Sequence, residues 1–224
     1  MIDSILPATV CAVQSFVHRL DITLSPQEEA LVVHAVPKRH AEFTTVRACA
    51  REALVALGRE PVPLLPDEWG APGWPPGVVG SMTHCAGYGA AAVAHADEVT
   101  AIGIDAEPNS PLPQGVLEII ARPEERTALA KLMTPVTAAA GPAWDRLLFS
   151  AKESVYKAWY PVTRRWLDFQ EASLELSPDG TFTARVLVPA PPELACLRGR
   201  WVANSGHVIT SVAVEACLSS RSGD

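Results

Sequence analysis

Two acidic residues, Asp105 and Glu107, follow the Ile-Gly-Ile run at 102–104 and are separated by one position. In an extended strand, residues two apart point to the same side, so these carboxylates would face one point in space. A third carboxylate, Glu153, lies in a segment with helical periodicity that also carries Lys157. Mg²⁺ prefers oxygen ligands and is often shared with substrate phosphates. The sequence therefore predicts a Mg²⁺ site at the three carboxylates, beside a phosphate-bearing ligand.

Simpler interpretations exist for these acidic residues. An isolated Asp-x-Glu is more often a solvated strand end than a metal site. Glu153 and Lys157 have the i, i+4 spacing of a surface ion pair, which contributes only a few tenths of a kcal/mol to helix stability. The apolar strand before Asp105 and the third carboxylate at Glu153 favour the metal site.

Two further segments contain groups that suit phosphate. Ser81 and Thr83 supply hydroxyls next to His84, although a histidine at a strand end is more often a packed side chain. Arg39 and Arg47 supply guanidinium groups, whose planar donors match phosphate oxygens. Each of these segments alone would be a weak signal of phosphate binding.

Together, the segments resemble the signature motifs of the 4'-phosphopantetheinyl transferases of the surfactin and enterobactin type, closest to the actinobacterial branch. Gly-Ile-Asp at 103–105 and Phe-Ser-Ala-Lys-Glu-Ser-Val-Tyr-Lys at 149–157 are similar to two family motifs. Val-Gly-Ser-Met-Thr-His-Cys at 79–85 and Arg-His-Ala-Glu-Phe at 39–43, continued by Arg47 and Arg51, are similar to two more. The order and approximate spacing of all four segments agree with the family pattern.

The resemblance implies an α+β fold of two similar α/β halves, a pseudo-dimer with the active site at their interface. It implies transfer of the 4'-phosphopantetheine arm of coenzyme A to a serine of an acyl or peptidyl carrier protein, with release of 3',5'-ADP. Coenzyme A is then the substrate and Mg²⁺ the metal, with Mn²⁺ as a possible substitute because oxygen ligands accept either ion. The carriers would belong to polyketide, nonribosomal-peptide or fatty-acid synthases, including siderophore assembly, and the sequence does not indicate which.

The resemblance also assigns roles to residues of this chain. The metal ligands would be Asp105, Glu107 and Glu153, and the catalytic residues Glu153, Asp105 and Lys157, with Glu153 as the candidate general base. The residues expected to bind coenzyme A are Arg39, Arg47, Thr83, His84, Asp105, Glu153 and Lys157. Arg51 fits a surface cation equally well, and Lys152 is a candidate second cation. A surface including Trp159, Tyr160, Trp166 and Leu167, with Arg164 and Arg165 among them, is the hypothesis for carrier docking or the pantetheine channel.

One residue departs from the family pattern. Relatives usually carry a lysine before the glycine of a Lys-Gly-x-Pro segment, and the matching residue here is Trp69. The missing cation keeps open a non-catalytic module that binds coenzyme A or a carrier, which binding without turnover would favour. The three carboxylates and several cations would also suit a Mg²⁺-dependent nucleotide phosphohydrolase, from which strict dependence on a protein acceptor separates the transferase.

Composition limits the class of protein. The chain of 224 residues has a formal net charge of −7, which argues against a nucleic-acid partner because such proteins need a strongly basic face. Its five cysteines are scattered without a zinc-site pattern and are expected to be reduced core thiols. Asp3 stands where a signal peptide would be basic, and no apolar run reaches transmembrane length. We therefore expect a cytoplasmic protein with no membrane partner, and the resemblance implies a monomer.

The pattern of apolar residues and turn signals predicts the elements that position these groups. A capping box at Ser25 should begin a helix that ends at Pro37, and a second helix should run from Phe43 to Gly58. A helical region is expected from residue 114, restarting at Pro123. The principal helix should span 144–160 and be closed by Pro161.

Strands are expected on either side of these helices. They cover residues 78–81, 88–94, 99–105, 172–176, 181–188 and 207–214. We place the domain boundary at Ile104. This gives an N-terminal half, 1–104, for the nucleotide of coenzyme A, and a C-terminal half, 105–224, for metal, catalysis and carrier docking.

Overall fold

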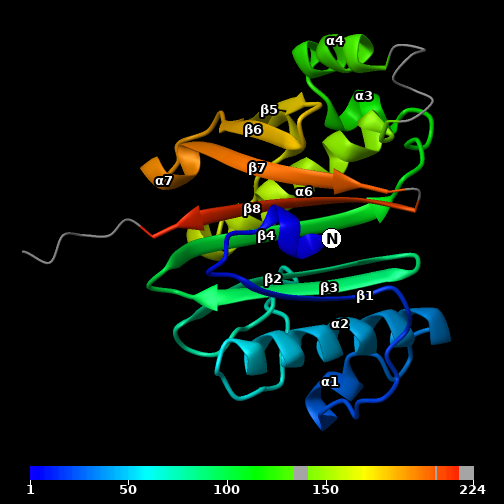
Figure 1. The fold of residues 1–224 in the computed structure, drawn as a ribbon, viewed down its shortest axis with the longest axis vertical. Coiled ribbons are helices and arrows are strands. Elements are labelled where there is room, and N and C mark those ends of the chain that lie inside the picture. Colours follow the sequence, from blue (N-terminus) through cyan, green and yellow to red (C-terminus); the bar gives the residue numbers. More distant parts are fainter. Residues whose placement is uncertain (134–140, 205, 217–224) are drawn as a thin grey trace, which may run out of the picture.

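A computed structural model describes residues 1–133, 141–204 and 206–216, which form two antiparallel sheets (Figure 1). The smaller sheet has the strand order β1-β3-β2 and consists of β1 (Cys11–Ser15), β2 (Val78–Cys85) and β3 (Tyr88–His95). The larger sheet has the order β4-β8-β7-β6-β5 and consists of β4 (Val99–Pro108), β5 (Ala172–Ser177), β6 (Thr181–Val186), β7 (Cys196–Ala203) and β8 (His207–Glu215). This mixture of helices and sheets confirms the predicted α+β class.

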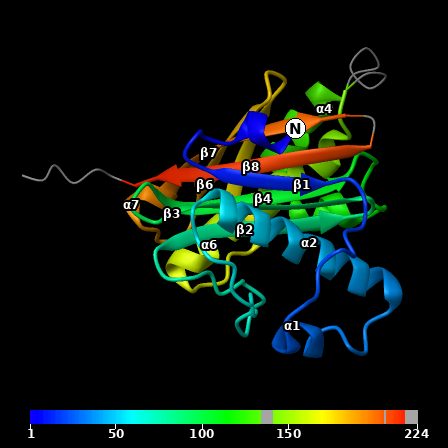
Figure 2. The ribbon, with the colours of Figure 1, turned by 60° about the horizontal axis from the view of Figure 1, so that its bottom comes forward.

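Each sheet is covered by one long helix. Helix α2 (Pro37–Ala56) packs against β1 and β3, and α6 (Trp144–Thr163) packs against β4 and β8. Figure 1 places α6 behind the larger sheet, and Figure 2 shows α2 running alongside the smaller one. The shorter helices are η1 (Ile2–Ile5), α1 (Pro26–Ala30), α3 (Val116–Ile120), α4 (Pro123–Leu132), η2 (Phe169–Glu171) and α7 (Pro192–Ala195).

The two sheets meet where β2 lies beside β4. The Ser81 hydroxyl accepts the backbone N–H of Ile104 at 3.1 Å, and the Thr83 hydroxyl accepts that of Ala106 at 3.1 Å. Side-chain oxygens thus replace the carbonyls that would continue the ladder, and they satisfy donors that burial would otherwise leave unpaired. These two hydroxyls fix the end of β4 where Asp105 is located.

Helix α6 approaches β4 closely because residue 103 is a glycine. A Cβ at that position would overlap the backbone carbonyl of Ser154. The buried stripe of α6, which includes Leu147, Ala151, Val155 and Trp159, forms the core with the larger sheet. This close packing sets the distance between the carboxylates of β4 and the side chains of α6.

The structure corrects several expected boundaries. Pro37 begins α2 and does not end the preceding helix, which stops at Ala30, because proline is well suited to the first helical turn. Pro161 lies inside α6, which ends two residues later with Arg164 in a left-handed cap conformation, φ 53°. The capping box at Ser25 is confirmed.

Two strands, β1 and β7, were missed by the sequence analysis. The expected strands from residues 78, 88, 99, 172, 181 and 207 are all present. Strand β4 crosses the expected domain boundary at Ile104 and belongs to the larger sheet over its whole length. The assignment of the halves to 1–104 and 105–224 stays a prediction.

Within the described residues, no helix combines the length and the apolar character that crossing a bilayer requires. Four cysteines in this part of the chain are free thiols, and Cys196 is exposed, so the expectation of core thiols is wrong for that residue. Its strand alternates exposed and buried positions, and residue 196 falls on the exposed side. Cys217 lies outside the described residues.

Candidate active site

The three predicted metal ligands come together where β4 passes α6, in what we call the carboxylate cluster: Asp105, Glu107 and Glu153. Asp105 is buried, and its Oδ1 accepts hydrogen bonds from Lys157 Nζ at 2.8 Å and from Thr83 Oγ1 at 3.3 Å. Lys157 also donates to the carbonyl of Ile104 at 3.2 Å. The other oxygen, Asp105 Oδ2, is buried without a hydrogen-bond partner in the described residues.

The other two carboxylates are affected by the same crowding. Burial raises the pKa of Glu153, and the charges of Asp105 and Glu107 raise it further against the opposing effect of Lys157. Burial and the charge of Asp105 also raise the pKa of Glu107, although Arg146 Nη1 donates to its carboxylate at 2.9 Å. Like charges that are close and partly desolvated produce this pattern. The cluster places three carboxylates beside two paired cations, Lys157 and Arg146.

This donor set fits a Mg²⁺ ion in its chemistry. Carboxylate oxygens are the ligands the ion prefers, and Asp105 Oδ2 is a buried acceptor with no partner. As they stand, the described residues contain no group of three or more His, Cys, Asp or Glu side chains placed to hold a metal ion. Ion pairs with Lys157 and Arg146 instead hold Asp105 and Glu107.

Four of the predicted phosphate-binding residues, Arg39, Arg47, Thr83 and His84, line a cavity of about 350 Å³, which we call the cationic cleft. Arg39, from the first turn of α2, hydrogen-bonds through Nη1 to Nε2 of His84 at the end of β2. Burial lowers the pKa of His84, and the charge of Arg39 lowers it further. This lowered pKa favours the neutral ring, whose Nε2 can accept the hydrogen bond from Arg39.

Arg47 occupies the floor of the cationic cleft. Its guanidinium lies 3.8 Å from the centre of the Phe43 ring, and its Nη2 donates to the Leu64 carbonyl at 3.0 Å. Burial lowers its pKa to about 10, and its Nε is buried without a hydrogen-bond partner in the described residues. Arg47 thus keeps unused donor capacity at the base of the cleft.

The fully buried Glu28 carboxylate offsets the positive charge of Arg47 and of the neighbouring Arg51. It accepts from Arg51 Nη2 at 2.6 Å and from the backbone N–H of Leu64 at 3.1 Å, and it lies 3.9 Å from Arg47 Nε. Arg51 also donates to the Thr23 carbonyl at 2.7 Å, so its guanidinium is used within the fold. This favours the structural interpretation of Arg51.

A row of cavities connects the cationic cleft to the carboxylate cluster. A second cavity of about 180 Å³ shares Gly70, Pro72 and Met82 with the cleft and is also lined by Glu153 and Lys157. A third of about 110 Å³ continues from Glu153 toward Trp166 and Phe169. An elongated ligand could therefore extend from the arginines to the carboxylates.

Two expectations about the surroundings of the site are corrected. The Lys152 ammonium is buried, and its three donors are used by the carbonyls of Phe169 (2.6 Å) and Ala172 (2.9 Å) and by Glu125 (2.9 Å). It cannot serve as a second cation for a ligand without breaking that set. Of the proposed docking residues, Trp159, Tyr160 and Leu167 are buried in the core that α6 forms with the larger sheet, whereas Trp166, Arg164 and Arg165 are exposed.

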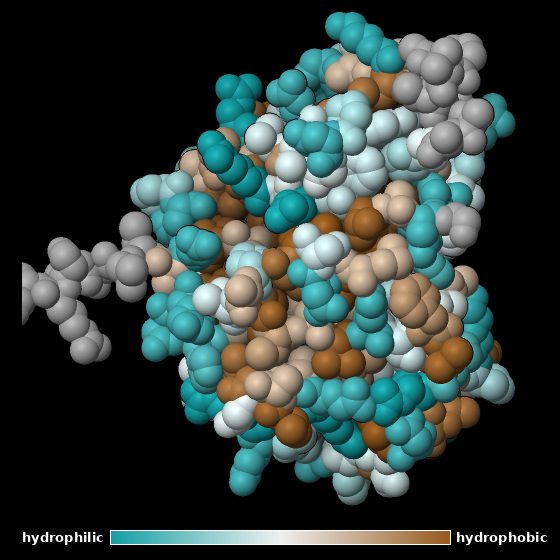
Figure 3. Space-filling view, in the orientation of Figure 1, coloured by the Kyte–Doolittle hydropathy of each residue, from teal (hydrophilic) through white to brown (hydrophobic). Residues whose placement is uncertain are grey.

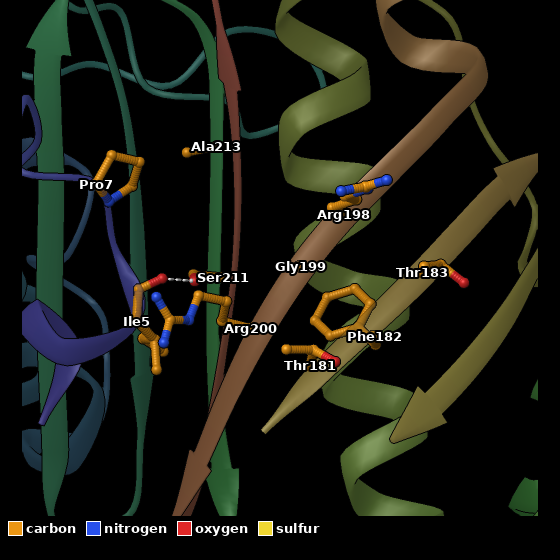
Figure 4. Close-up of a pocket in the computed structure, with 10 residues that line it drawn as sticks. All are labelled: Ile5, Pro7, Thr181, Phe182, Thr183, Arg198, Gly199, Arg200, Ser211 and Ala213. Carbon is orange, nitrogen blue, oxygen red and sulfur yellow. Dashed lines mark hydrogen bonds between the residues drawn. The ribbon is translucent and has the colours of Figure 1, made fainter. Parts of the chain in front are cut away.

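A separate cavity of about 490 Å³ lies on the face of the larger sheet opposite α6. Figure 4 shows Ile5 and Pro7 from the N-terminal segment on one side of it and Arg198 on β7 on the other. In Figure 3, hydrophobic residues run through the middle of this face and hydrophilic ones surround them. None of the predicted site residues lines this cavity.

Sequence reasoning missed three residues that organise the site: Arg146, Glu28 and Asp67. Glu28 was visible only as part of a capping box, and no local pattern links Arg146 to Glu107, 39 positions away. Asp67 carried a detectable signal, because Asp followed by Gly at the third position is typical of a turn closed by the Asp side chain.

Most of the chain matches two models of known protein families. Residues 27–94 match the family model for the 4'-phosphopantetheinyl transferase N-terminal domain, and residues 101–211 match that for the 4'-phosphopantetheinyl transferase superfamily. The chain is 54% identical to the 4'-phosphopantetheinyl transferase Svp of Streptomyces mobaraensis, over 96% of this chain and 90% of the relative.

Two further proteins are similar to this chain over most of their length. The 4'-phosphopantetheinyl transferase PptT of Mycobacterium tuberculosis is 43% identical over 96% of this chain and 98% of its own. Enterobactin synthase component D of Salmonella typhi is 30% identical over 88% and 80%. The two family models cover every residue of the carboxylate cluster and the cationic cleft, the relatives match almost the whole chain, and the chain therefore belongs to the 4'-phosphopantetheinyl transferase superfamily.

Proposed function

We propose that the protein transfers the 4'-phosphopantetheine arm of coenzyme A to a serine hydroxyl of a carrier protein, in a Mg²⁺-dependent reaction that releases 3',5'-ADP. The observation that carries this proposal is the row of cavities from the cationic cleft to the carboxylate cluster. A ligand with phosphates at one end and a flexible arm at the other fits such a path. Family membership supports the same reaction.

The cationic cleft would bind the nucleotide end of coenzyme A. Arg39, Arg47 and His84 line it, and Arg47 Nε is a buried donor without a partner. Guanidinium groups bind phosphate oxygens through paired, charge-assisted hydrogen bonds. Thr83 lies between the two ends, where its hydroxyl holds Asp105. Binding here would orient the pyrophosphate toward Lys157 and the carboxylates.

Asp105, Glu107 and Glu153 would hold the Mg²⁺ ion. When bound, the ion would neutralise negative charge that grows on the pyrophosphate as the leaving group departs. Lys157, which donates to Asp105, would contact the same phosphates. Mn²⁺ would serve in the same site because the ligands are all oxygen atoms.

Glu153 is the proposed general base. It lines the two cavities on either side of the cluster, where a serine hydroxyl of the acceptor would reach it. The serine oxygen forms a bond to the phosphorus of the phosphopantetheine arm while the bond from that phosphorus to the bridging oxygen breaks. Glu153 takes the serine proton, and 3',5'-ADP leaves with the bridging oxygen.

The acceptors would be carrier proteins or carrier domains of polyketide, nonribosomal-peptide or fatty-acid synthases. The relative named enterobactin synthase component D supports a siderophore pathway as one further source of carriers. Because the protein is itself acidic, with net charge −7, docking of an acidic carrier must rest on a local surface near Trp166 and Arg164. We expect the protein to work as a cytoplasmic monomer, with residues 1–104 binding the nucleotide and 105–224 carrying metal and acceptor.

The test is intact-mass analysis of a purified apo carrier protein incubated with this protein, coenzyme A and Mg²⁺. A gain of one phosphopantetheine unit that disappears with EDTA supports the proposal. Hydrolysis of coenzyme A without a carrier would favour the phosphohydrolase. Coenzyme A binding without modification of fatty-acid, polyketide or peptide carriers would favour the non-catalytic module.

A further inference from the structure

Residues 66–72, which we call the Trp69 loop, are closed around one carboxylate. Asp67 Oδ1 accepts the backbone N–H groups of Trp69 at 3.0 Å and of Ala71 at 2.9 Å. The Asp67 N–H donates to the Ala71 carbonyl, and Pro66 pairs with Pro72 in an isolated bridge. The loop therefore depends on Asp67 for its shape.

The same carboxylate connects the loop to α6. Asp67 Oδ2 accepts from the Tyr160 hydroxyl at 3.1 Å and from Arg164 Nη1 at 2.8 Å. Tyr160 is in the last turn of α6, and Arg164 is its C-cap. Burial alone would raise the pKa of Asp67, but the N–H donors of Trp69 and Ala71, with Tyr160 and Arg164, hold it below its ordinary value. The carboxylate thus stays charged and uses four donors.

The loop forms a wall shared by the first two cavities of the row. Gly70 and Pro72 line both the cationic cleft and the 180 Å³ cavity, and Trp69 lines the latter together with Glu153 and Lys157. The centre of the Trp69 ring lies 6.3 Å from that of Trp166, which lines the 110 Å³ cavity. Both indoles are 59% exposed, so packing within the protein alone does not fix Trp69.

We propose that Asp67 is a positioning residue that holds the Trp69 loop against α6, so that Trp69 closes over coenzyme A between the cationic cleft and the carboxylate cluster. This inference rests on the proposed function, because it takes coenzyme A as the ligand of that path. An ordered loop loses less conformational entropy when the ligand binds, so Asp67 increases affinity without touching a reacting atom. Because Trp69 stands in the place of the usual lysine, the side chain that covers the ligand here is an aromatic ring and not a cation.

Asp67→Asn is the first test, because it keeps an oxygen for the loop N–H groups but removes the charge that faces Arg164. The Kd of coenzyme A by calorimetry and its KM should both rise about tenfold, the scale of ordering one or two side chains, while kcat changes less than twofold. Glu68→Gln is the matched control: it removes one negative charge from an exposed neighbour in the same loop and should leave Kd and KM within twofold.

If Asp67→Asn folds poorly, two other variants can test the same contact by removing the donors to Asp67. Tyr160→Phe removes a single donor, and Arg164→Gly removes the other while suiting the left-handed cap conformation. Each should raise the Kd in the same direction. In a Trp69→Ala background, Asp67→Asn should add little, because the two residues act through one contact surface.

Unchanged Kd and KM in Asp67→Asn, full additivity with Trp69→Ala, or a fall in kcat at saturating coenzyme A would overturn the inference. Because calorimetry measures binding without a carrier, a protein that binds coenzyme A but transfers nothing would contradict the proposed function and leave the Asp67 measurement intact.

Discussion

The cationic cleft and the carboxylate cluster both hold like charges close together, but the protein compensates them differently. In the cleft, buried Glu28 accepts from Arg51 and lies close to Arg47. Burial alone would raise the pKa of Glu28, yet hydrogen bonds from the Ser25 and Leu64 N–H groups lower it below its ordinary value. The acid that balances this end is therefore charged and fully hydrogen-bonded.

In the carboxylate cluster, the balance is incomplete. Lys157 and Arg146 each pair with one acid, and still the pKa values of Glu107 and Glu153 are raised. One end of the path thus has its countercharge built into the fold, and the other retains an excess of negative charge. This difference supports the proposed function, in which the cleft would bind the phosphates of coenzyme A and a cation that comes with the ligand would complete the cluster.

The largest effect should come from Asp105→Asn. The amide keeps an oxygen for Thr83 but removes the charge that Lys157 and the expected metal need. Transfer at saturating coenzyme A and Mg²⁺ should fall about 1000-fold, because the charge stabilisation at such a site amounts to several kcal/mol. Single-turnover modification of a carrier, followed by intact mass, measures it.

The comparison also predicts that the Kd of coenzyme A in Asp105→Asn changes far less than the rate, since the cationic cleft is untouched. Circular dichroism and thermal melting serve as controls for folding. Turnover within tenfold of the unsubstituted protein would remove Asp105 from the reaction.

Gly103→Ala should disrupt the cluster through the fold. The new Cβ would overlap the Ser154 carbonyl and push α6 away from β4, which separates Glu153 from Asp105. We expect a loss of about 3 kcal/mol in the free energy of unfolding, measured in urea, with reduced transfer. Gly73→Ala is the matched control, since its Cβ would make only an ordinary contact with Leu65. Equal stability of the two variants would contradict the close-packing argument.

The fold was predictable wherever a local pattern determined it. The alternation and turn signals gave six of the strands, and the apolar stripe gave α6. Strand β7 escaped because its exposed positions carry Arg198 and Arg200 and its buried ones include Gly199, a position that the Phe182 ring occupies from the neighbouring strand. That packing is non-local and leaves no apolar run in the sequence.

The site was predictable to the same extent. Asp105, Glu107, Glu153 and Lys157 lie in two compact motifs, and the structure brings them together. The residues that hold them, such as Arg146 and Asp67, act on partners 39 to 97 positions away. No spacing rule connects such pairs, because only the packing of α6 against β4 and the Trp69 loop brings them into contact.

Arg39→Gln tests the cationic cleft directly. Arg39 contacts His84 at the rim, and losing one charge-assisted hydrogen bond to a phosphate should raise the KM of coenzyme A about tenfold while kcat changes less than twofold. Lys38→Gln is the control, because Lys38 is the preceding cation, is largely exposed and lies 3.9 Å from Glu42. If both variants had the same KM for coenzyme A, Arg39 would be an ordinary surface cation with no role in binding.

The smallest effect on activity should come from removing Lys152 together with its partner. Lys152→Met alone leaves Glu125 buried without its counterion and should lower the free energy of unfolding by about 3 kcal/mol in urea. The double variant Lys152→Met with Glu125→Gln should recover part of this loss, because the glutamine oxygen can still accept from the Leu174 N–H. Below the melting temperature, its KM for coenzyme A should stay within twofold. A tenfold rise in that KM would mean that Lys152 breaks its three contacts in the fold to bind the ligand. The positive charge available to the carboxylate cluster would then include Lys152 as well as Lys157 and Arg146.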